Sequence, residues 1–189
     1  MLTKTLSIAI YRVTNRYTVA LLTLLFCLYI FWILPGSANV ERIVGSADAR
    51  ILPFFPYLLY TPGDLYAQLG AFGPKGRAAF VDYRIVKDTL WLLTLGGFLA
   101  LATSAALRYA VAPGVPLSRL NLVAPLPALF DLLENQLQNV LVLLYPARHD
   151  SLAMVAASLT ATKWVTLVAA VIILLAALAR AAAVRIHRG

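Results

Sequence analysis

The stretch LNLVAPLPALFDLLENQLQNVLVLLYP, residues 120 to 146, decides the fold of this chain. It is long and apolar enough to cross a bilayer, for which a helix needs about 20 residues. Its middle carries six polar side chains, which are Asp131, Glu134, Asn135, Gln136, Gln138 and Asn139. A carboxylate at that depth costs a few kcal/mol unless a partner or water compensates for it. The stretch therefore predicts a membrane helix whose polar face is turned toward the protein interior.

The composition of the whole chain agrees with a membrane protein. Of the 189 residues, 61% are hydrophobic and only 13% are charged, and the mean hydropathy is +0.82. We expect one all-α transmembrane domain over residues 1–189. The net charge of +8 points to contacts with anionic lipid. The basic residues are scattered and form no stripe with aromatics, so we expect no nucleic-acid partner.

Three further apolar runs accompany the central helix, so the sequence predicts four transmembrane helices in an antiparallel bundle. We expect the spans at approximately residues 17–35, 89–112, 125–146 and 152–178. The first run has a competing interpretation as a secretory signal peptide, but it exceeds the usual length of such an apolar segment. Residues 36–88 form an extramembrane or interfacial insert with short helices.

A helix start lies inside this insert. Thr61 is in the position of an N-cap, Pro62 follows at the first helical position and Asp64 stands three residues after the cap. Gly70 and Gly73 are expected to end that helix. A second helix then begins at Pro74 and is predicted to run through residue 88 into the next span.

The distribution of lysine and arginine orients the four spans. Both termini then lie on one side, where the basic residues near the spans have no acidic neighbours. The count of eight against seven barely favours this side, and the absence of acids adds to it. We expect cytoplasmic termini and an integral protein of a bacterial inner membrane.

Most of the polar residues of the central helix share one face. Asp131, Glu134, Asn135 and Gln138 follow the spacing i, i+3, i+4, i+7, and Asn139 continues that face a turn further. The opposite face is predicted to carry leucines toward lipid or another helix, namely Leu132, Leu133, Leu137 and Leu141.

Hairpin geometry predicts a partner for this face. If the third and fourth spans are antiparallel about a turn centred between Arg148 and His149, Glu134 and Lys163 are each 14.5 positions from its centre. Both then lie about 20 Å from the turn. The sequence therefore predicts a Glu134–Lys163 pair, with Asp131 one turn closer to the cytoplasmic side.

Two interpretations of this pair stay open. As a site, Glu134 or Asp131 would carry a proton, Lys163 would be the charge partner, and Asn135, Gln138 and Asn139 would orient a ligand. As a structural contact, the same residues would only fasten two helices together, at about 1 kcal/mol for each polar contact. Two acids facing one lysine favour the site.

A second group of charges precedes the second span. Arg77, Arg84 and Asp88 fall on one helix face, and Arg84 and Asp88 are also an i, i+4 pair. This face either guards the mouth of the bundle and binds a phosphate or carboxylate, or it is a solvated face that pairs with itself. The solvated face is the favoured interpretation, because surface pairs are weak and common.

Several chemistries are set aside. The two histidines, His149 and His187, are far apart, and the chain has one cysteine, so we expect no metal site. Neither a G-x-S-x-G elbow nor a G-x-x-x-x-G-K phosphate loop is present. We expect no cofactor, and any catalysis would rest on carboxylate, lysine and amide groups.

Three short motifs occur in order: TPGDLY from Thr61, GPKGR from Gly73 with Asp88 downstream, and DLLEN from Asp131. Together they resemble small four-span bacterial membrane proteins that have no assigned activity. The resemblance covers about residues 57–165. It implies four spans and singles out Asp131, Glu134 and Asn135, but it implies no reaction.

These observations lead to three hypotheses about function. The first is a membrane protein that binds a lipid or lipid-like ligand in a buried acidic pocket, with acid/base chemistry on that ligand. The second is a non-enzymatic scaffold or assembly subunit, and the third is a proton-coupled transporter. The expected partners are membrane lipid and either a second copy of the chain or another subunit of a membrane complex.

Overall fold

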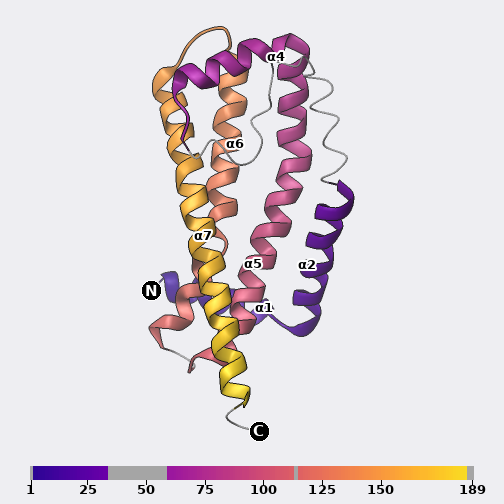
Figure 1. The fold of residues 1–189 in the computed structure, drawn as a ribbon, viewed down its shortest axis with the longest axis vertical. Helices are drawn as coiled ribbons and strands as arrows, with labels where there is room; N and C mark the ends of the chain where they lie inside the picture. The colour runs from indigo at the N-terminus through magenta and orange to yellow at the C-terminus, as the bar shows by residue number, and fades with distance from the viewer. Residues whose placement is uncertain (1, 34–58, 113–114, 187–189) are drawn as a thin grey trace.

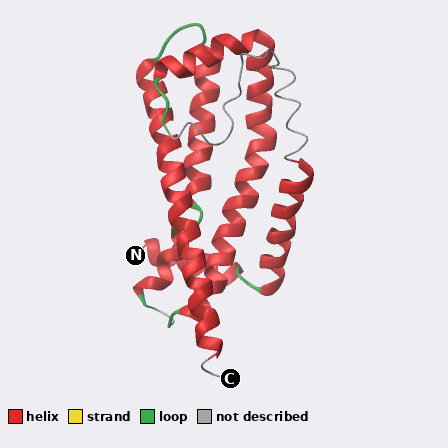
Figure 2. Cartoon of the chain, viewed as in Figure 1, coloured by secondary structure: helices red, strands yellow, loops and turns green. Residues whose placement is uncertain are grey.

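The computed structural model describes residues 2–33, 59–112 and 115–186, and every regular element in these ranges is helical (Figure 2). The all-α prediction is confirmed for this part of the chain. The helices are α1 (Leu2–Val13), α2 (Arg16–Leu28), α4 (Pro62–Tyr83), α5 (Thr89–Ala110), α6 (Leu126–Leu144) and α7 (Asp150–Ile186). π-Helical turns follow α2 (Tyr29–Ile33) and α4 (Arg84–Asp88), and a 3-10 helix (Pro116–Leu122) precedes α6. The first part of the expected insert, residues 36–58, lies outside the described residues.

Two helical stretches of the described chain are long and apolar enough to cross a membrane, namely Pro62–Ala110 and α7. A third qualifies if α1 and α2, which meet at a bend of 87°, are taken together. The helix α6 is not among them, because six polar side chains interrupt its 19 residues. Large apolar side chains nevertheless point outward from several helices, such as Leu93 at 67% exposure, Leu143 at 76% and Val165 at 69%. Outward apolar surface of this extent is what a membrane protein requires.

Three helices form the centre of the bundle, where α6 and α7 lie along each other and α5 packs against both (Figure 1). Gly96, Ala100 and Ser104 line the inner side of α5, and all three are buried. A Cβ atom added to Gly96 would lie 2.7 Å from the Cβ of Ala128 on α6. These small residues repeat at every fourth position, and such a face lets two backbones approach closely.

The first part of α4 lies across one end of the bundle (Figure 1). Thr61 and Asp64 cap its start as predicted, and the backbone of Gly73 (φ 61°) interrupts it before the chain turns along the bundle into α5. Gly70, which was expected to end the helix, lies within it. A positive φ suits glycine, which has no Cβ atom.

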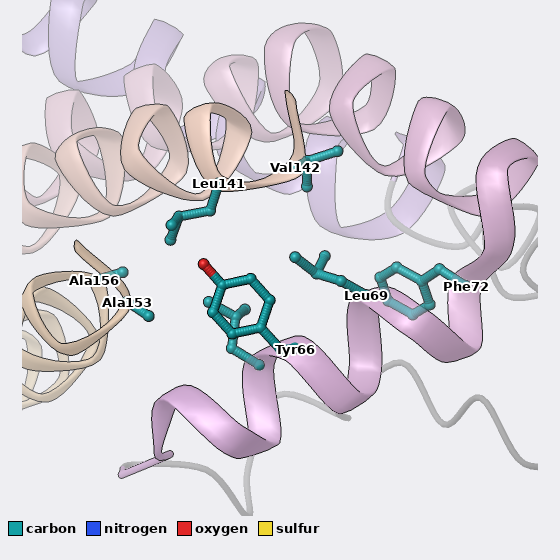
Figure 3. Packing of buried hydrophobic residues seen from close by; sticks show 8 residues of the cluster. Tyr66, Leu69, Phe72, Leu141, Val142, Ala153 and Ala156 are labelled. Carbon is teal, nitrogen blue, oxygen red and sulfur yellow. The ribbon is translucent and has the colours of Figure 1, made fainter. Parts of the chain in front are cut away.

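Apolar side chains hold α4 in this position. Tyr66, Leu69 and Phe72 of α4 face Leu141 and Val142 of α6 and two alanines of α7 (Figure 3). The backbone N–H of His149 donates to the phenol oxygen of Tyr66 at 2.6 Å. Leu141 is fully buried, so its predicted place on the face opposite the polar residues is wrong. It lies seven residues after Glu134 and three after Gln138, which puts it on their face of the helix, and α4 covers this end of α6.

At the opposite end, α1 folds back across the bundle (Figure 1). The side chain of Asn15 accepts hydrogen bonds from the backbone of Tyr17 and Thr18, which starts α2 as a separate helix. Three buried neutral side chains then join α1, α5 and the 3-10 helix. Ser7 donates to Asn121 at 2.8 Å, and Asn121 donates to Ser104 at 3.1 Å. We call Ser7, Ser104 and Asn121 the neutral cluster.

Candidate functional site

Lys163 of α7 bridges two carboxylates of α6. Its Nζ lies 2.6 Å from Oε2 of Glu134 and 3.1 Å from Oδ1 of Asp131. The side chains are nearly buried, with exposures of 16% for Lys163, 4% for Glu134 and 13% for Asp131. The predicted Glu134–Lys163 contact is confirmed, and the same ammonium also binds Asp131. The roles assigned to these groups stay predictions.

The polar face of α6 is turned inward as a whole. Glu134, Asn135, Gln138 and Asn139 are buried, whereas Leu132 and Leu133 on the other side of the helix are exposed. Gln136 is the exception among the six polar residues, because it is exposed. The helical spacing explains this, since Gln136 is two residues from Glu134 and therefore on a different face.

Asp88 joins the polar face of α6 from the π-helical turn that precedes α5. Asn135 donates from Nδ2 to Oδ2 of Asp88 at 2.8 Å, and Nη1 of Arg84 lies 3.4 Å from the same oxygen. The side chains of Arg84 and Asp88 are 16% and 11% exposed. The favoured expectation of a solvated face is therefore wrong for these two residues. We call Arg84, Asp88, Asp131, Glu134 and Lys163 the ionic cluster.

Arg77 is not part of the ionic cluster, although it was predicted on the same face as Arg84. Its Nη1 donates to the carbonyl oxygen of Leu69 at 2.9 Å, and its guanidinium lies 4.2 Å from the centre of the Tyr145 ring. Arg77 and Arg84 are seven positions apart, which is a distance of about 10 Å along the helix axis. Arg77 thus stabilises the corner between α4 and the bundle.

Tyr60 is the neighbour of the ionic cluster that the sequence did not indicate. Nε2 of Gln138 donates to Oε1 of Glu134 at 2.9 Å and lies 3.1 Å from the Tyr60 hydroxyl oxygen. Burial raises the pKa of the Tyr60 phenol above its ordinary value of 10.0, so the hydroxyl stays protonated at neutral pH. One feature of the sequence could have placed Tyr60 near the end of the bundle: it directly precedes Thr61, the cap residue that fixes where α4 begins.

The cluster has more acceptors than donors. Three carboxyl groups (Asp88, Asp131 and Glu134) face two cations (Arg84 and Lys163). In addition, the buried side-chain oxygens of Asn135 and Asn139 have no hydrogen-bond partner in the described structure. A buried acceptor without a partner costs about 1–3 kcal/mol. The arrangement therefore favours any group that brings a proton or another hydrogen-bond donor.

Metal binding receives no support from the described residues, because no three His, Cys, Asp or Glu side chains are grouped as metal ligands there. Each carboxylate of the ionic cluster contacts a cation instead, since Arg84 pairs with Asp88 and Lys163 pairs with Asp131 and Glu134. The chemistry that the cluster offers is proton exchange and hydrogen bonding.

Comparisons with family models, with curated proteins and with solved structures found no match. The resemblance of the three short motifs to small four-span bacterial membrane proteins therefore stays a prediction. What this protein does has to be inferred from the chemistry of its own buried groups.

Proposed function

We propose that the chain is a four-span antiparallel membrane bundle whose ionic cluster binds the donor-bearing head of a lipid-like ligand. In this proposal α2, α5, α6 and α7 cross a bacterial inner membrane, and both termini are cytoplasmic. Two observations support the membrane location. Two helical stretches, or three when α1 and α2 are taken together, are long and apolar enough to cross a membrane, and many leucines and valines point outward. The short α6 crosses as well, because its polar face is covered by α5 and α7.

The surplus of acceptors carries the proposal about the ligand. A hydroxyl or an amine in the cluster would give donors to Oδ1 of Asn135 and Asn139, which are buried without a partner. An amine would also balance the third carboxylate. A fatty carboxylate would add a fourth acid instead, and it is therefore the wrong ligand for this site.

The same surplus supports acid/base chemistry. With three acids and two bases in a buried site, the neutral state holds one proton on a carboxyl group. Glu134 and Asp131 share one ammonium, and in this proposal one of the two carries the proton while the other stays paired with Lys163. A bound amine or hydroxyl could exchange a proton with this carboxyl group, and Asn135 and Gln138 would orient it.

Binding of single-chain probes tests the proposal. We expect dodecylamine and dodecanol to stabilise the purified protein in detergent by about 1.4–2.7 kcal/mol at ten to a hundred times their dissociation constants. Dodecanoic acid should not stabilise it. Asn135→Leu should remove the effect, and Gln136→Leu, which changes an exposed amide on the same helix, should preserve it. Equal stabilisation by all three probes, or none by any, would contradict the proposal.

A scaffold or assembly subunit is the second candidate, and one observation favours it. Only 11% of the most apolar 18-residue segment of α7 is buried within the chain. This 37-residue helix therefore leaves a long surface for the helices of a second copy or another subunit. A scaffold predicts that no probe binds and that the protein purifies as a stable assembly.

A further inference from the structure

Charged side chains and a cavity coincide at the end of the bundle opposite α4. A cavity of about 400 Å³ opens there between α1, the end of α5 and the 3-10 helix. Its size falls within the usual range for ligand pockets. The ionic cluster takes no part in it, since none of the five charged residues of that cluster lines the cavity.

Three cations line this cavity, and no acidic side chain is among the described residues of its lining. The three cations are Lys4 of α1, Arg108 of α5 and Arg119 of the 3-10 helix. Arg108 donates to the backbone carbonyl of Tyr11 and lies beside its ring, so its position is fixed. Within the described residues, neither Lys4 nor Arg119 forms a salt bridge. Their positive charge is therefore available to a bound anion.

Apolar side chains complete the lining. Ile8, Leu107 and Val111 contribute hydrocarbon surface next to the three cations, and Tyr11 and Ser118 add hydroxyl groups. A lining that is cationic and apolar together matches an amphipathic anion better than an inorganic one. A phosphate would pair with the cations, and an acyl chain would cover the aliphatic side chains.

The walls of the cavity are held in place before any ligand binds. The neutral cluster joins all three elements, and the Tyr11 hydroxyl donates to the carbonyl oxygen of Ser118 at 2.9 Å. A preformed site loses little conformational entropy on binding. The bend of 87° between α1 and α2 also matters, because it lays α1 along the membrane surface when α2 crosses the membrane.

From this combination we propose that the cavity is a binding site for an anionic phospholipid. Its phosphate is bound by Lys4, Arg108 and Arg119, and one acyl chain lies against Ile8 and Leu107. The site lies at headgroup depth on the side of the termini. It differs from the ionic cluster in position and in sign, since the ionic cluster has one carboxylate more than it has cations, and this cavity is lined by three cations.

Lipid titration followed by native mass spectrometry tests this site. We expect phosphatidylglycerol to bind the purified protein more tightly than phosphatidylcholine with the same acyl chains. Lys4→Gln combined with Arg119→Gln should weaken phosphatidylglycerol binding on the order of 25-fold, at about fivefold for each cation. Both side chains are exposed, so the fold should be unaffected.

The matched control removes two charges from the same end of the chain. Arg12 and Arg16 do not line the cavity, so Arg12→Gln with Arg16→Gln should retain most of the affinity. Lys4→Arg with Arg119→Lys should bind like the parent. An equal loss in both glutamine doubles, or equal binding of the two lipids, would overturn the proposal. Displacement of the lipid by an equal concentration of inorganic phosphate would show a phosphate site and would also overturn it.

Discussion

The neutral cluster and the ionic cluster are both buried polar groups that join three segments of the bundle, yet they differ in how completely they are satisfied. Asn121 of the neutral cluster is fully buried and makes hydrogen bonds to Ser7 and Ser104. The ionic cluster has one acid more than it has bases, and two amide oxygens beside it lack partners. A closed neutral set fastens helices, whereas an open charged set is costly unless something else completes it.

Removing the lysine of the ionic cluster should have the largest effect. Lys163→Met leaves three carboxyl groups with one cation, and we expect a loss of about 3–5 kcal/mol in unfolding free energy. The double variant Glu134→Gln, Lys163→Met should be more stable than Lys163→Met alone, because it removes an uncompensated charge. Equilibrium unfolding in detergent micelles measures all three proteins.

The control for this prediction is an exposed ion pair. Arg148 and Asp150 lie 3.1 Å apart with exposures of 56% and 59%, so Arg148→Gln should cost less than about 1 kcal/mol. If Lys163→Met costs no more than Arg148→Gln, the contrast between the two clusters does not hold.

Opening the neutral cluster should have a smaller effect. Asn121→Leu leaves Ser7 and Ser104 without their shared partner, and interhelical hydrogen bonds in membranes contribute about 1–2 kcal/mol. We expect a loss of that size by the same unfolding measurement. Gln136→Leu, an exposed amide on α6, should be nearly neutral. A loss for Asn121→Leu as large as that for Lys163→Met would contradict the contrast between the neutral cluster and the ionic cluster.

Removing the Tyr60 hydroxyl, which lies beside the ionic cluster, should have the smallest effect on stability. Tyr60→Phe removes the hydroxyl beside Gln138 and should cost about 0.5–1.5 kcal/mol near pH 7.

The difference in unfolding free energy between the parent and Tyr60→Phe should change with pH in a definite direction. Burial raises the pKa of the folded phenol above 10.0, so the stability of the parent is complete below the unfolded pKa of about 10 and falls as the pH rises above it. The difference from Tyr60→Phe should therefore narrow between about pH 8 and about pH 10.5. Unfolding at both pH values measures it, and a difference that widens would show that the phenol is not buried.

The Glu134–Lys163 contact could be predicted because two features of the sequence determine it, the short turn between the helices and the spacing of polar residues. Only a short turn separates α6 from α7, so distance from the turn fixes which residues share a depth. The spacing of polar residues on α6 then fixes the face. The N-terminal bend was also readable in principle, since Asn15 stands three residues before Thr18 at the start of the apolar run.

The contact between Asp88 and Asn135 was not predictable in the same way. These residues are 47 positions apart, and no short turn relates their helices. Their meeting depends on the rotation of α5 about its own axis, and on the α6 side this rotation must also bring Gly96 against Ala128. Helical spacing alone placed Asp88 on a face shared with Arg77 but did not show which neighbour that face meets.

The π-helical turn at Arg84–Asp88 has a consequence for the register of the whole protein. A single wide turn holds one residue more than an α-helical turn, which advances the angular phase of everything downstream by about 100°. The buried face of α4 before the turn and the buried face of α5 after it are therefore rotated relative to each other about the helix axis. Asp88 meets α6 at the turn, and Gly96 approaches α6 closely further along α5. Chains that share this architecture would conserve the number of residues between positions 84 and 96 more strictly than the identity of most of them.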